Sequence, residues 1–368
     1  MAVHAHPDDE SSKAAAALLY LKSLGFEVTV VTCTDGGQGD VLNPDLEYPY
    51  RPDPDNSSVA YASAQEVEAN IAEVRRAEMK EAARHLKLDH HVWLGFKDSG
   101  FTVGNGKAAV EGSFSTKSVE EAAKPLVAAM REHKPHVVST YAENGGYPHL
   151  DHIMSHKITE FAFRVAGDPG WCPELGEAWQ PLKLYYSDSL SYSRRDALTA
   201  AMLQRGKKVE MHAEGTGRHP TTRVKCDEFF EQARRALKSH ATQVPHDFWF
   251  SVPTGVECQV YPYNDFELIY SYVSTPKQEP TGKLTEEFTE GLTTAVDGTK
   301  LFGQAFTYVS QHAPTPDLRS VAQGLSMSQA ATLSFGRGVA SAEPSAQKAV
   351  RHASAYKAGQ TSRQSALR

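Results

Sequence analysis

Near its start the chain reads Val3-His4-Ala5-His6-Pro7-Asp8-Asp9-Glu10, in which an imidazole and two adjacent carboxylates follow a short apolar segment typical of a buried strand. A second polar cluster, Tyr147-Pro148-His149-Leu150-Asp151-His152, follows another strand-like segment far downstream. Both clusters are therefore expected in loops that leave the ends of strands.

The first 190 residues alternate strand-like and helix-like segments, which predicts an α/β fold with a doubly wound, mostly parallel sheet and helices on both faces. The predicted strands, rich in β-branched and aromatic residues, are Ala2 to Ala5, Phe26 to Cys33, His91 to Phe96, His136 to Tyr141 and Leu182 to Ser187. The predicted helices are Ser11 to Leu24, Gln65 to Leu88, Ser118 to about His133, and one that begins near Asp151. Pro125 predicts a kink or a later start in the third helix.

The order of the strands decides whether the two polar clusters meet. In the common 3-2-1-4-5 arrangement the first and fourth strands are neighbours, and the chain reverses its winding direction between them. Ligands bind in the crevice outside the carboxyl ends of those two strands. The loops that leave them carry His6 to Asp9 and Tyr147 to His152, so topology and chemistry indicate the same location.

The two clusters offer the ligands of a catalytic zinc site. His6 and Asp9 lie three residues apart across a turn, and His152 completes the set from the neighbouring loop. Two imidazoles and one carboxylate leave a Zn²⁺ site with net positive charge and an open position, which suits it to polarise a carbonyl and to activate water. The same ligands accept Fe²⁺. A His-Pro-Asp turn alone is more often a simple helix entry, but the doubled carboxylate argues against that reading.

Other residues of the clusters have the chemistry of acids, bases and donors. Asp8 adjoins a ligand and is the natural general base, which would take a proton from the attacking water and pass it to the leaving nitrogen. His149 is placed to stabilise an oxyanion or to act as an acid, and Asp151 to orient His149 or a ligand imidazole. Tyr147 has a phenolic hydroxyl for the oxyanion or the departing amine. We therefore predict a metal-dependent hydrolase.

The chain divides into three predicted regions: residues 1–190 as the metal-hydrolase core, 191–275 as a substrate-shaping cap of the same catalytic domain, and 276–368 as a low-complexity, flexible tail. Helices are expected at Arg194 to Gln204 and Thr221 to His240. Strand-like aromatic pieces follow at Phe248 to Phe250 and Phe266 to Tyr270.

Composition restricts the partners and the compartment. A net charge of -7 argues against a general affinity for nucleic acid or for an anionic membrane. The four cysteines are widely spaced and form no CxxC pair, which argues against disulfides and a thiolate zinc site. Neither a membrane span nor a signal peptide is evident, so a cytoplasmic protein acting on a small molecule is expected. The sequence leaves open whether the chain forms a homo-oligomer.

Beyond this chemistry, the sequence resembles the LmbE-like or PIG-L-like zinc N-deacetylases. The resemblance rests on the two clusters and on four shorter pieces, which are 31–34, 74–79, 93–100 and 240–243. It implies a Rossmann-like fold, one Zn²⁺ per chain held by His6, Asp9 and His152, and hydrolysis of an amide on an amino sugar. Leu150 stands where the family usually has proline, so a slightly different helix entry is expected.

Within the family, the stretches Glu10 to Lys13 and Glu143 to His149 are similar to the members that cleave mycothiol S-conjugates into a mercapturic acid and glucosaminyl-inositol. This resemblance implies that Arg75 and Asp98 hold sugar hydroxyls, and that Lys13 favours the conjugate over a plain acetyl group. Two alternatives stay open at this point. One is the N-acetylglucosaminyl-inositol deacetylase of mycothiol biosynthesis, and the other is a non-catalytic sugar-binding or metal-binding protein.

Overall fold

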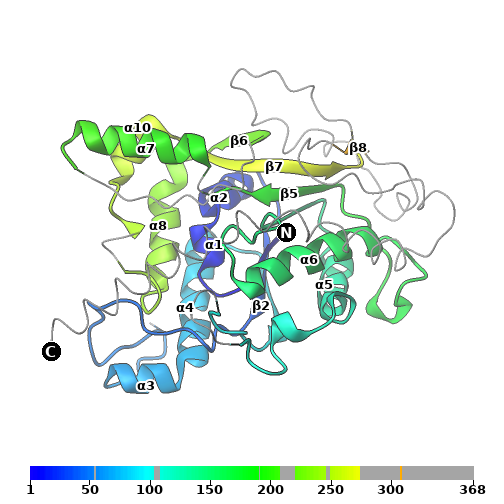
Figure 1. The fold of residues 1–368 in the computed structure, drawn as a ribbon, viewed down its shortest axis with the longest axis horizontal. Helices are drawn as coiled ribbons and strands as arrows, with labels where there is room; N and C mark the ends of the chain where they lie inside the picture. The colour runs from blue at the N-terminus through cyan, green and yellow to red at the C-terminus, as the bar shows by residue number, and fades with distance from the viewer. Residues whose placement is uncertain are drawn as a thin grey trace.

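The computed structural model describes residues 1–53, 55–102, 108–189, 191–207, 220–245, 249–273 and 307–308. Within these ranges the molecule is built around one mixed sheet in the order β3-β2-β1-β4-β5-β7-β6, with β8 paired to β7 (Figure 1). The order of the first five strands confirms the predicted 3-2-1-4-5 arrangement. The predicted tail, 276–368, lies outside the described residues except for the two residues of β8.

The parallel half of the sheet has the strands that the sequence predicts. They are β1 (Ala2–His4), β2 (Thr29–Thr34), β3 (His90–Phe96), β4 (Val137–Thr140) and β5 (Lys183–Ser187). Every residue of β1 and β2 is buried, as expected for central strands covered on both faces. Strand β1 pairs in parallel with both β2 and β4, so the loops after β1 and β4 leave the same edge of the sheet.

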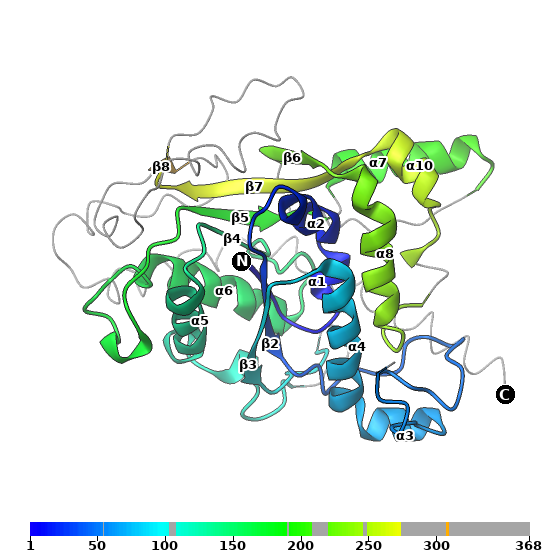
Figure 2. The same ribbon diagram turned by 180° about the vertical axis from the view of Figure 1, so that it is seen from behind.

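Helices cover both faces of this sheet, as predicted (Figures 1 and 2). They are α1 (Asp9–Ser12), α2 (Ala15–Ser23), α3 (Ala64–Ala69), α4 (Ile71–Leu86), α5 (Val119–His133), α6 (Leu150–Val165), α7 (Tyr192–Gln204), α8 (Phe230–Ser239) and α10 (Thr254–Val260), with short 3-10 turns η1 (Phe114–Thr116), η2 (Pro173–Leu175) and η3 (Asp227–Phe229). Val3 and Val31 pack with residues of α5 and α6, whereas Ala2 and Val30 pack with Met79 of α4. Alternate residues of each central strand therefore serve opposite layers.

Two predicted helices are each divided in the structure. The first, Ser11 to Leu24, is interrupted because Ala14 adopts a left-handed backbone with φ 68°, so α1 ends and α2 begins on either side of it. The second, Gln65 to Leu88, is interrupted at Asn70. By contrast, α5 runs through Pro125, so the later start predicted for it is wrong, and Ser118 caps its first turn by accepting a bond from Glu121 N–H at 3.2 Å.

The part after residue 190 continues the same sheet with antiparallel strands. β7 (Tyr263–Ser271) pairs with β5, β6 (Thr222–Lys225) and β8 (Thr307–Tyr308). The strand predicted at Phe266 to Tyr270 is confirmed, but the helix predicted from Thr221 is wrong in its first part, where β6 alternates buried and more exposed side chains against β7. The division into three regions stays a prediction.

The aromatic piece at 248–250 was expected to be a strand, and the described part of it is not. Trp249 N–H bonds to the Pro245 carbonyl at 3.3 Å, which is helical spacing, and the Phe250 ring lies beside Arg234 and Lys238 of α8. Phe248 lies outside the described residues. In the ranges that the structure describes, no helix has the length and apolarity needed to cross a bilayer.

A buried carboxylate ties three helices of the later region together. Glu257 of α10 contacts Arg194 of α7 and bonds to Arg234 Nη2 of α8 at 2.9 Å. Burial alone would raise the pKa of Glu257, but the charge of Arg194 and the bonds to both arginines hold it below its ordinary value.

This contact predicts how stability depends on pH. Because the folded-state pKa of Glu257 lies below the unfolded value of about 4.3, its contribution is complete above about pH 5 and is lost as the pH falls through the folded-state pKa. Glu257→Gln should therefore lower the free energy of unfolding by about 2–4 kcal/mol at pH 7. Urea denaturation should give a smaller difference between variant and wild type at pH 4, and an equal difference at both pH values would contradict the assignment.

Candidate metal centre and active site

Both polar clusters meet at one cavity of about 550 Å³ on the carboxyl side of β1 and β4. The predicted site residues on its lining are His6, Asp8, Asp9, Lys13, Arg75, Asp98, Tyr147 and His149. Asp151 and His152, at the start of α6, are fully buried behind them. The fold therefore brings all ten predicted site residues to one place, although His6 and His152 are far apart in the sequence.

His152 and Asp9 form the core of this cluster. His152 Nδ1 lies 2.9 Å from the Gly145 carbonyl and donates to it, so Nε2 carries a lone pair. In the part of the chain that the structure describes, Nε2 has no hydrogen-bond partner, and it lies 3.3 Å from Asp9 Oδ2. Burial lowers the pKa of His152, so its ring is neutral. Two electron-pair donors thus face each other without a proton between them.

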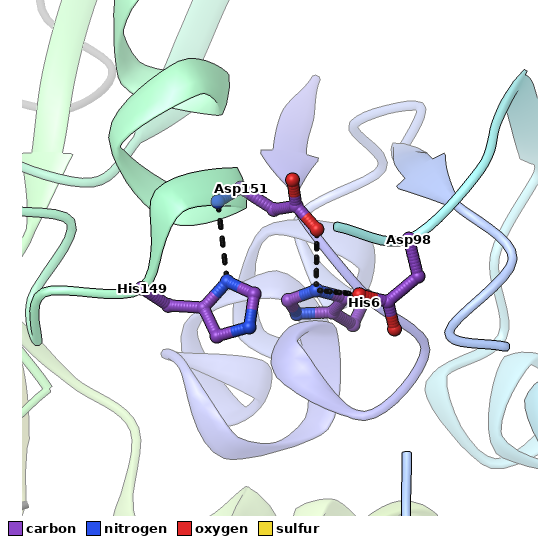
Figure 3. Close-up of side chains that lie close together, drawn as sticks. All are labelled: His6, Asp98, His149 and Asp151. Carbon is purple, nitrogen blue, oxygen red and sulfur yellow. Dashed lines mark hydrogen bonds and ion pairs between the residues drawn. The ribbon is translucent and has the colours of Figure 1, made fainter. Parts of the chain in front are cut away.

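His6 brings a third donor to the same point. Its Nε2 lies 3.2 Å from Asp151 Oδ2, and its Nδ1 lies 3.6 Å from Asp9 Oδ2 (Figure 3 shows the contact with Asp151). If Nε2 donates to Asp151, Nδ1 has its lone pair free for a cation shared with Asp9 and His152. One ligand atom from each of these three residues lies within 4.8 Å of the others. A carboxylate behind a ligand imidazole is the usual arrangement of metal-binding histidines.

A second group of potential ligands also contains His6. It consists of His6, Asp98, His149 and Asp151, drawn in Figure 3. In this group several of the atoms that could bind a metal already accept hydrogen bonds. Asp151 accepts from Ser99 N–H at 2.9 Å and from the Ser99 hydroxyl, and His149 Nδ1 accepts from Asp151 N–H at 3.1 Å. The unpartnered Nε2 of His152 therefore favours the first group as the better fit to a metal ion.

The charges of the cluster call for a cation as well. Burial would raise the pKa of Asp9, but His152 and Lys13 hold it well below its usual range. Burial would lower the pKa of His6, but Asp98 and hydrogen bonds to Asp151 and Asp9 hold it well above its usual range. The carboxylates thus favour a positive charge at His6, which is supplied either by a second proton on the ring or by a divalent ion that takes the place of that proton at Nδ1.

Asp8 stands beside this cluster with its carboxylate on the cavity wall. Its Oδ2 accepts from Arg75 Nη2 at 3.2 Å, and the side chain keeps a quarter of its surface exposed. Burial raises the pKa of Asp8 to about 6, against the opposing charge of Arg75 and with added repulsion from Asp9. A carboxylate with such a pKa is a better proton acceptor near neutral pH than an ordinary one.

Two hydrogen-bond donors, His149 and Tyr147, line the same cavity. Because His149 Nδ1 accepts from Asp151 N–H, its proton stays on Nε2. Burial lowers the pKa of His149 well below its usual range, and His6 and His152 lower it further, so the ring is a neutral donor. The Tyr147 ring lies 4.5 Å from that of His152. Together these groups can stabilise negative charge that develops on a carbonyl oxygen.

The three predicted substrate-binding residues also line the cavity, but each has a protein partner. Lys13 Nζ lies 3.4 Å from Asp9 Oδ1. Arg75 donates to the carbonyls of Gly36 and Pro7 at 2.9 and 2.7 Å in addition to Asp8. Asp98 accepts from Gly100 N–H at 2.8 Å. Gly36 allows this approach, because a Cβ there would lie 2.6 Å from the Arg75 guanidinium.

Sequence reasoning assigned no role to several supporting residues. Tyr141 stacks on His152 with ring centroids 4.4 Å apart and accepts from Ala5 N–H at 2.8 Å. Ser99 holds both oxygens of Asp151, and Glu10 meets His240 at 2.7 Å. Ser99 and His240 do fall within the short pieces that carry the family resemblance, and their place there was the one indication in the sequence that they support the site. Their partners depend on tertiary contacts.

The fold and the site define a doubly wound α/β protein with a buried histidine-aspartate group suited to a metal ion. Residues 1–163 match the family model described as PIG-L, GlcNAc-PI de-N-acetylase. The chain is 44% identical over 291 residues to the mycothiol S-conjugate amidase of Streptomyces coelicolor, covering 76% of this chain and 94% of that protein. It therefore belongs to the PIG-L family, as the resemblance suggested.

Two further matches are more distant. A 1D-myo-inositol 2-acetamido-2-deoxy-alpha-D-glucopyranoside deacetylase of Streptomyces avermitilis is 31% identical over 290 residues, covering 75% of this chain and 93% of that protein. Among solved structures, the N,N'-diacetylchitobiose deacetylase of Pyrococcus horikoshii matches at 18% identity with a TM-score of 0.47, covering 73% of this chain and 82% of that one.

The two candidate ligand groups make different predictions about metal binding. If His6, Asp9 and His152 hold the ion, Asp9→Asn and His152→Ala should each weaken Zn²⁺ binding at least ~100-fold, while Asp98→Asn changes it less than ~10-fold. Titration of each chelator-treated variant with Zn²⁺, followed by elemental analysis, measures its Zn²⁺ affinity and its zinc content. Zinc loss in Asp98→Asn together with zinc retention in Asp9→Asn would move the site to the other group.

Proposed function

We propose that this protein is a zinc-dependent amidase that hydrolyses the amide bond of mycothiol S-conjugates and releases a mercapturic acid and glucosaminyl-inositol. The observation that carries the hydrolase chemistry is the convergence of three electron-pair donors, from His6, Asp9 and His152, beside the Asp8 carboxylate in one cavity. The choice of substrate is supported by 44% identity with the amidase against 31% with the deacetylase.

The proposed ligands suit Zn²⁺, and they also accept Fe²⁺. When bound there, the ion supplies Lewis-acid polarisation of the amide carbonyl and acidifies water. Asp151 keeps His6 oriented through its Nε2, and Gly145 does the same for His152 through its Nδ1. Both ligand rings therefore have a fixed tautomer before any substrate arrives.

Asp8 moves the proton of the reaction. It takes a proton from the attacking water as the water oxygen bonds to the amide carbon, and it delivers that proton to the leaving nitrogen as the C–N bond breaks. The products are a carboxylic acid and an amine, which become a carboxylate and an ammonium ion when the acid proton passes to the amine, so no other reactant is needed. Arg75 holds Asp8 in place through its 3.2 Å bond, and this bond also keeps the carboxylate directed along the cavity wall.

His149 and Tyr147 act on the carbonyl oxygen. The neutral His149 donates its Nε2 proton to the oxygen as negative charge develops, and the Tyr147 hydroxyl assists from the cavity rim. This refines the expectation from sequence, which left His149 as either an acid or an oxyanion donor. The hydrogen bond from Asp151 N–H favours the second role, because it fixes the donor nitrogen.

Recognition of the substrate is divided between two sides of the cavity. Asp98 and Arg75 lie on the polar side near the cluster and would meet the sugar hydroxyls, and Lys13 would meet the cysteinyl part. The other side comes from the region after residue 190, where apolar side chains lie beside the ion-paired Arg194, Arg234 and Glu257; the apolar lining includes Leu198, Phe230, Leu237, Trp249 and Val252. We propose that this side receives the group on sulfur, so residues 191–275 act as the substrate-shaping cap.

Deacetylation of N-acetylglucosaminyl-inositol is the second candidate, supported by the 31% identity with a deacetylase across 93% of its length. The same cluster would cleave the acetyl amide by the same steps. Parallel assays of the purified protein with a bimane conjugate of mycothiol and with the acetylated sugar test the preference. A higher kcat/KM for the acetylated sugar would replace the proposed substrate with this one.

Removing Asp8 tests the proposed general base. Asp8→Ala should lower kcat for the bimane conjugate by about 10²–10⁴-fold, because the proton transfer loses its acceptor. The zinc content should stay near that of wild type, since Asp8 is not a proposed ligand. Single-turnover kinetics and elemental analysis measure the two quantities. Turnover preserved within ~3-fold would defeat the assignment.

Removing Trp249 tests the apolar side of the cavity. Trp249→Ala should lower kcat/KM for the bimane conjugate by about 5–20-fold, because an aromatic contact is lost, and should change kcat/KM for the acetylated sugar less than ~2-fold. Tyr192→Ala is the matched control, since Tyr192 is a partly exposed aromatic of the same region that is not part of the cavity lining. Equal losses on both substrates would contradict the proposal.

A further inference from the structure

Asp8 has an unusual backbone conformation for a residue that carries a side chain. Its φ is 113° and its ψ is -27°, in the left-handed half of conformational space that residues with a Cβ rarely adopt. Such a conformation costs about 1–3 kcal/mol and persists only where surrounding contacts fix it. The contacts that fix Asp8 therefore also decide where its carboxylate points.

One of these contacts comes from Glu10, two residues further on. Glu10 Oε2 accepts from Asp8 N–H at 2.9 Å, while its Oε1 accepts from the Ser11 hydroxyl at 2.5 Å. Glu10 is fully buried. Its carboxylate thus spans the turn and holds the amide of Asp8, but a buried carboxylate needs further partners to stay in place.

A further partner of Glu10 is His240, which is 230 residues away in the sequence. His240 Nε2 lies 2.7 Å from Glu10 Oε1, and His240 is also fully buried, just after the last residue of α8. The segment is anchored independently of this contact, because Thr242 donates to Glu78 of α4 twice at 2.8 Å. His240 therefore stands in a fixed position from which it reaches Glu10.

We infer that His240 is a positioning residue for Asp8: by holding Glu10 against the Asp8 amide, it keeps Asp8 in its left-handed conformation with its carboxylate on the cavity wall. His240 is not among the residues that line the cavity, so its proposed role acts through Asp8. The inference rests on the proposed role of Asp8 as general base. Arg75 holds the carboxylate of Asp8, whereas the Glu10-His240 pair holds its backbone.

Two substitutions that both introduce a side-chain amide, but at different distances from the backbone, test this inference. The amide nitrogen of glutamine is as many bonds from the backbone as Nε2 of histidine, whereas that of asparagine is one bond closer. His240→Gln should keep kcat within ~3-fold of wild type. His240→Asn should lower kcat about 10-fold or more, while KM for the bimane conjugate and the zinc content stay within ~2-fold.

A matched control separates positioning from general loss of packing. Gln232 of α8 donates to the His85 carbonyl at 2.7 Å and does not contact Glu10. Gln232→Ala should lower the melting temperature without lowering kcat by more than ~2-fold. If Gln232→Ala and His240→Asn lose kcat equally, or if His240→Asn retains it within ~2-fold, His240 has no positioning role.

Crystal structures of the two His240 variants give a readout that does not depend on turnover. In His240→Gln the φ of Asp8 should stay positive, and in His240→Asn it should leave the left-handed region. An unchanged Asp8 in His240→Asn would overturn the inference even if kcat fell. If wild-type protein cleaves neither the conjugate nor the acetylated sugar, the proposed function fails, while these structures still decide the geometric part.

Discussion

Asp9 Oδ2 and His152 Nε2 lie 3.3 Å apart in the interior, each presenting an electron pair to the other. Two such groups repel unless a positive charge lies between them, and the repulsion is stronger in the protein interior than in bulk water. The rest of the site is arranged around this constraint. Gly145 fixes the tautomer of His152, Asp151 that of His6, and Lys13 lies beside Asp9 from the start of the chain.

The sheet is what makes this arrangement rigid. Strands β1 and β4 are adjacent and parallel, with Ala2 opposite Ser139, so the two loops that carry the cluster leave the same edge of the sheet although they lie far apart in the sequence. Tyr141 then joins the loops directly, since its hydroxyl accepts from Ala5 N–H while its ring stacks on His152. A site supported by paired central strands loses little conformational entropy when a ligand binds.

We propose that the region after residue 190 contributes to function in two ways. It lines part of the cavity, and His240, just after α8, contacts Glu10 beside the turn that carries Asp8. In this proposal, substrate recognition and the placement of the general base both depend on α8. A change in the packing of α8 is therefore expected to alter both the substrates that enter and the rate at which they react.

Much of the parallel core follows from the sequence alone. Buried parallel strands leave continuous β-branched and aromatic segments, and the proposed ligands stand in two short clusters, so the fold class, the strand order and the meeting of both clusters at one cavity were predictable. The breaks within helices and the antiparallel edge of the sheet could not be predicted. Ala14 interrupts a helix that its neighbours favour, and Thr222 to Lys225 form a strand because β7 offers an unpaired edge. The tertiary structure alone decides which nitrogen of each histidine faces the proposed metal position and which distant residue contacts Glu10 beside Asp8. A hydrogen bond between residues as distant as Glu10 and His240, 230 positions apart, leaves no periodic trace in the chain.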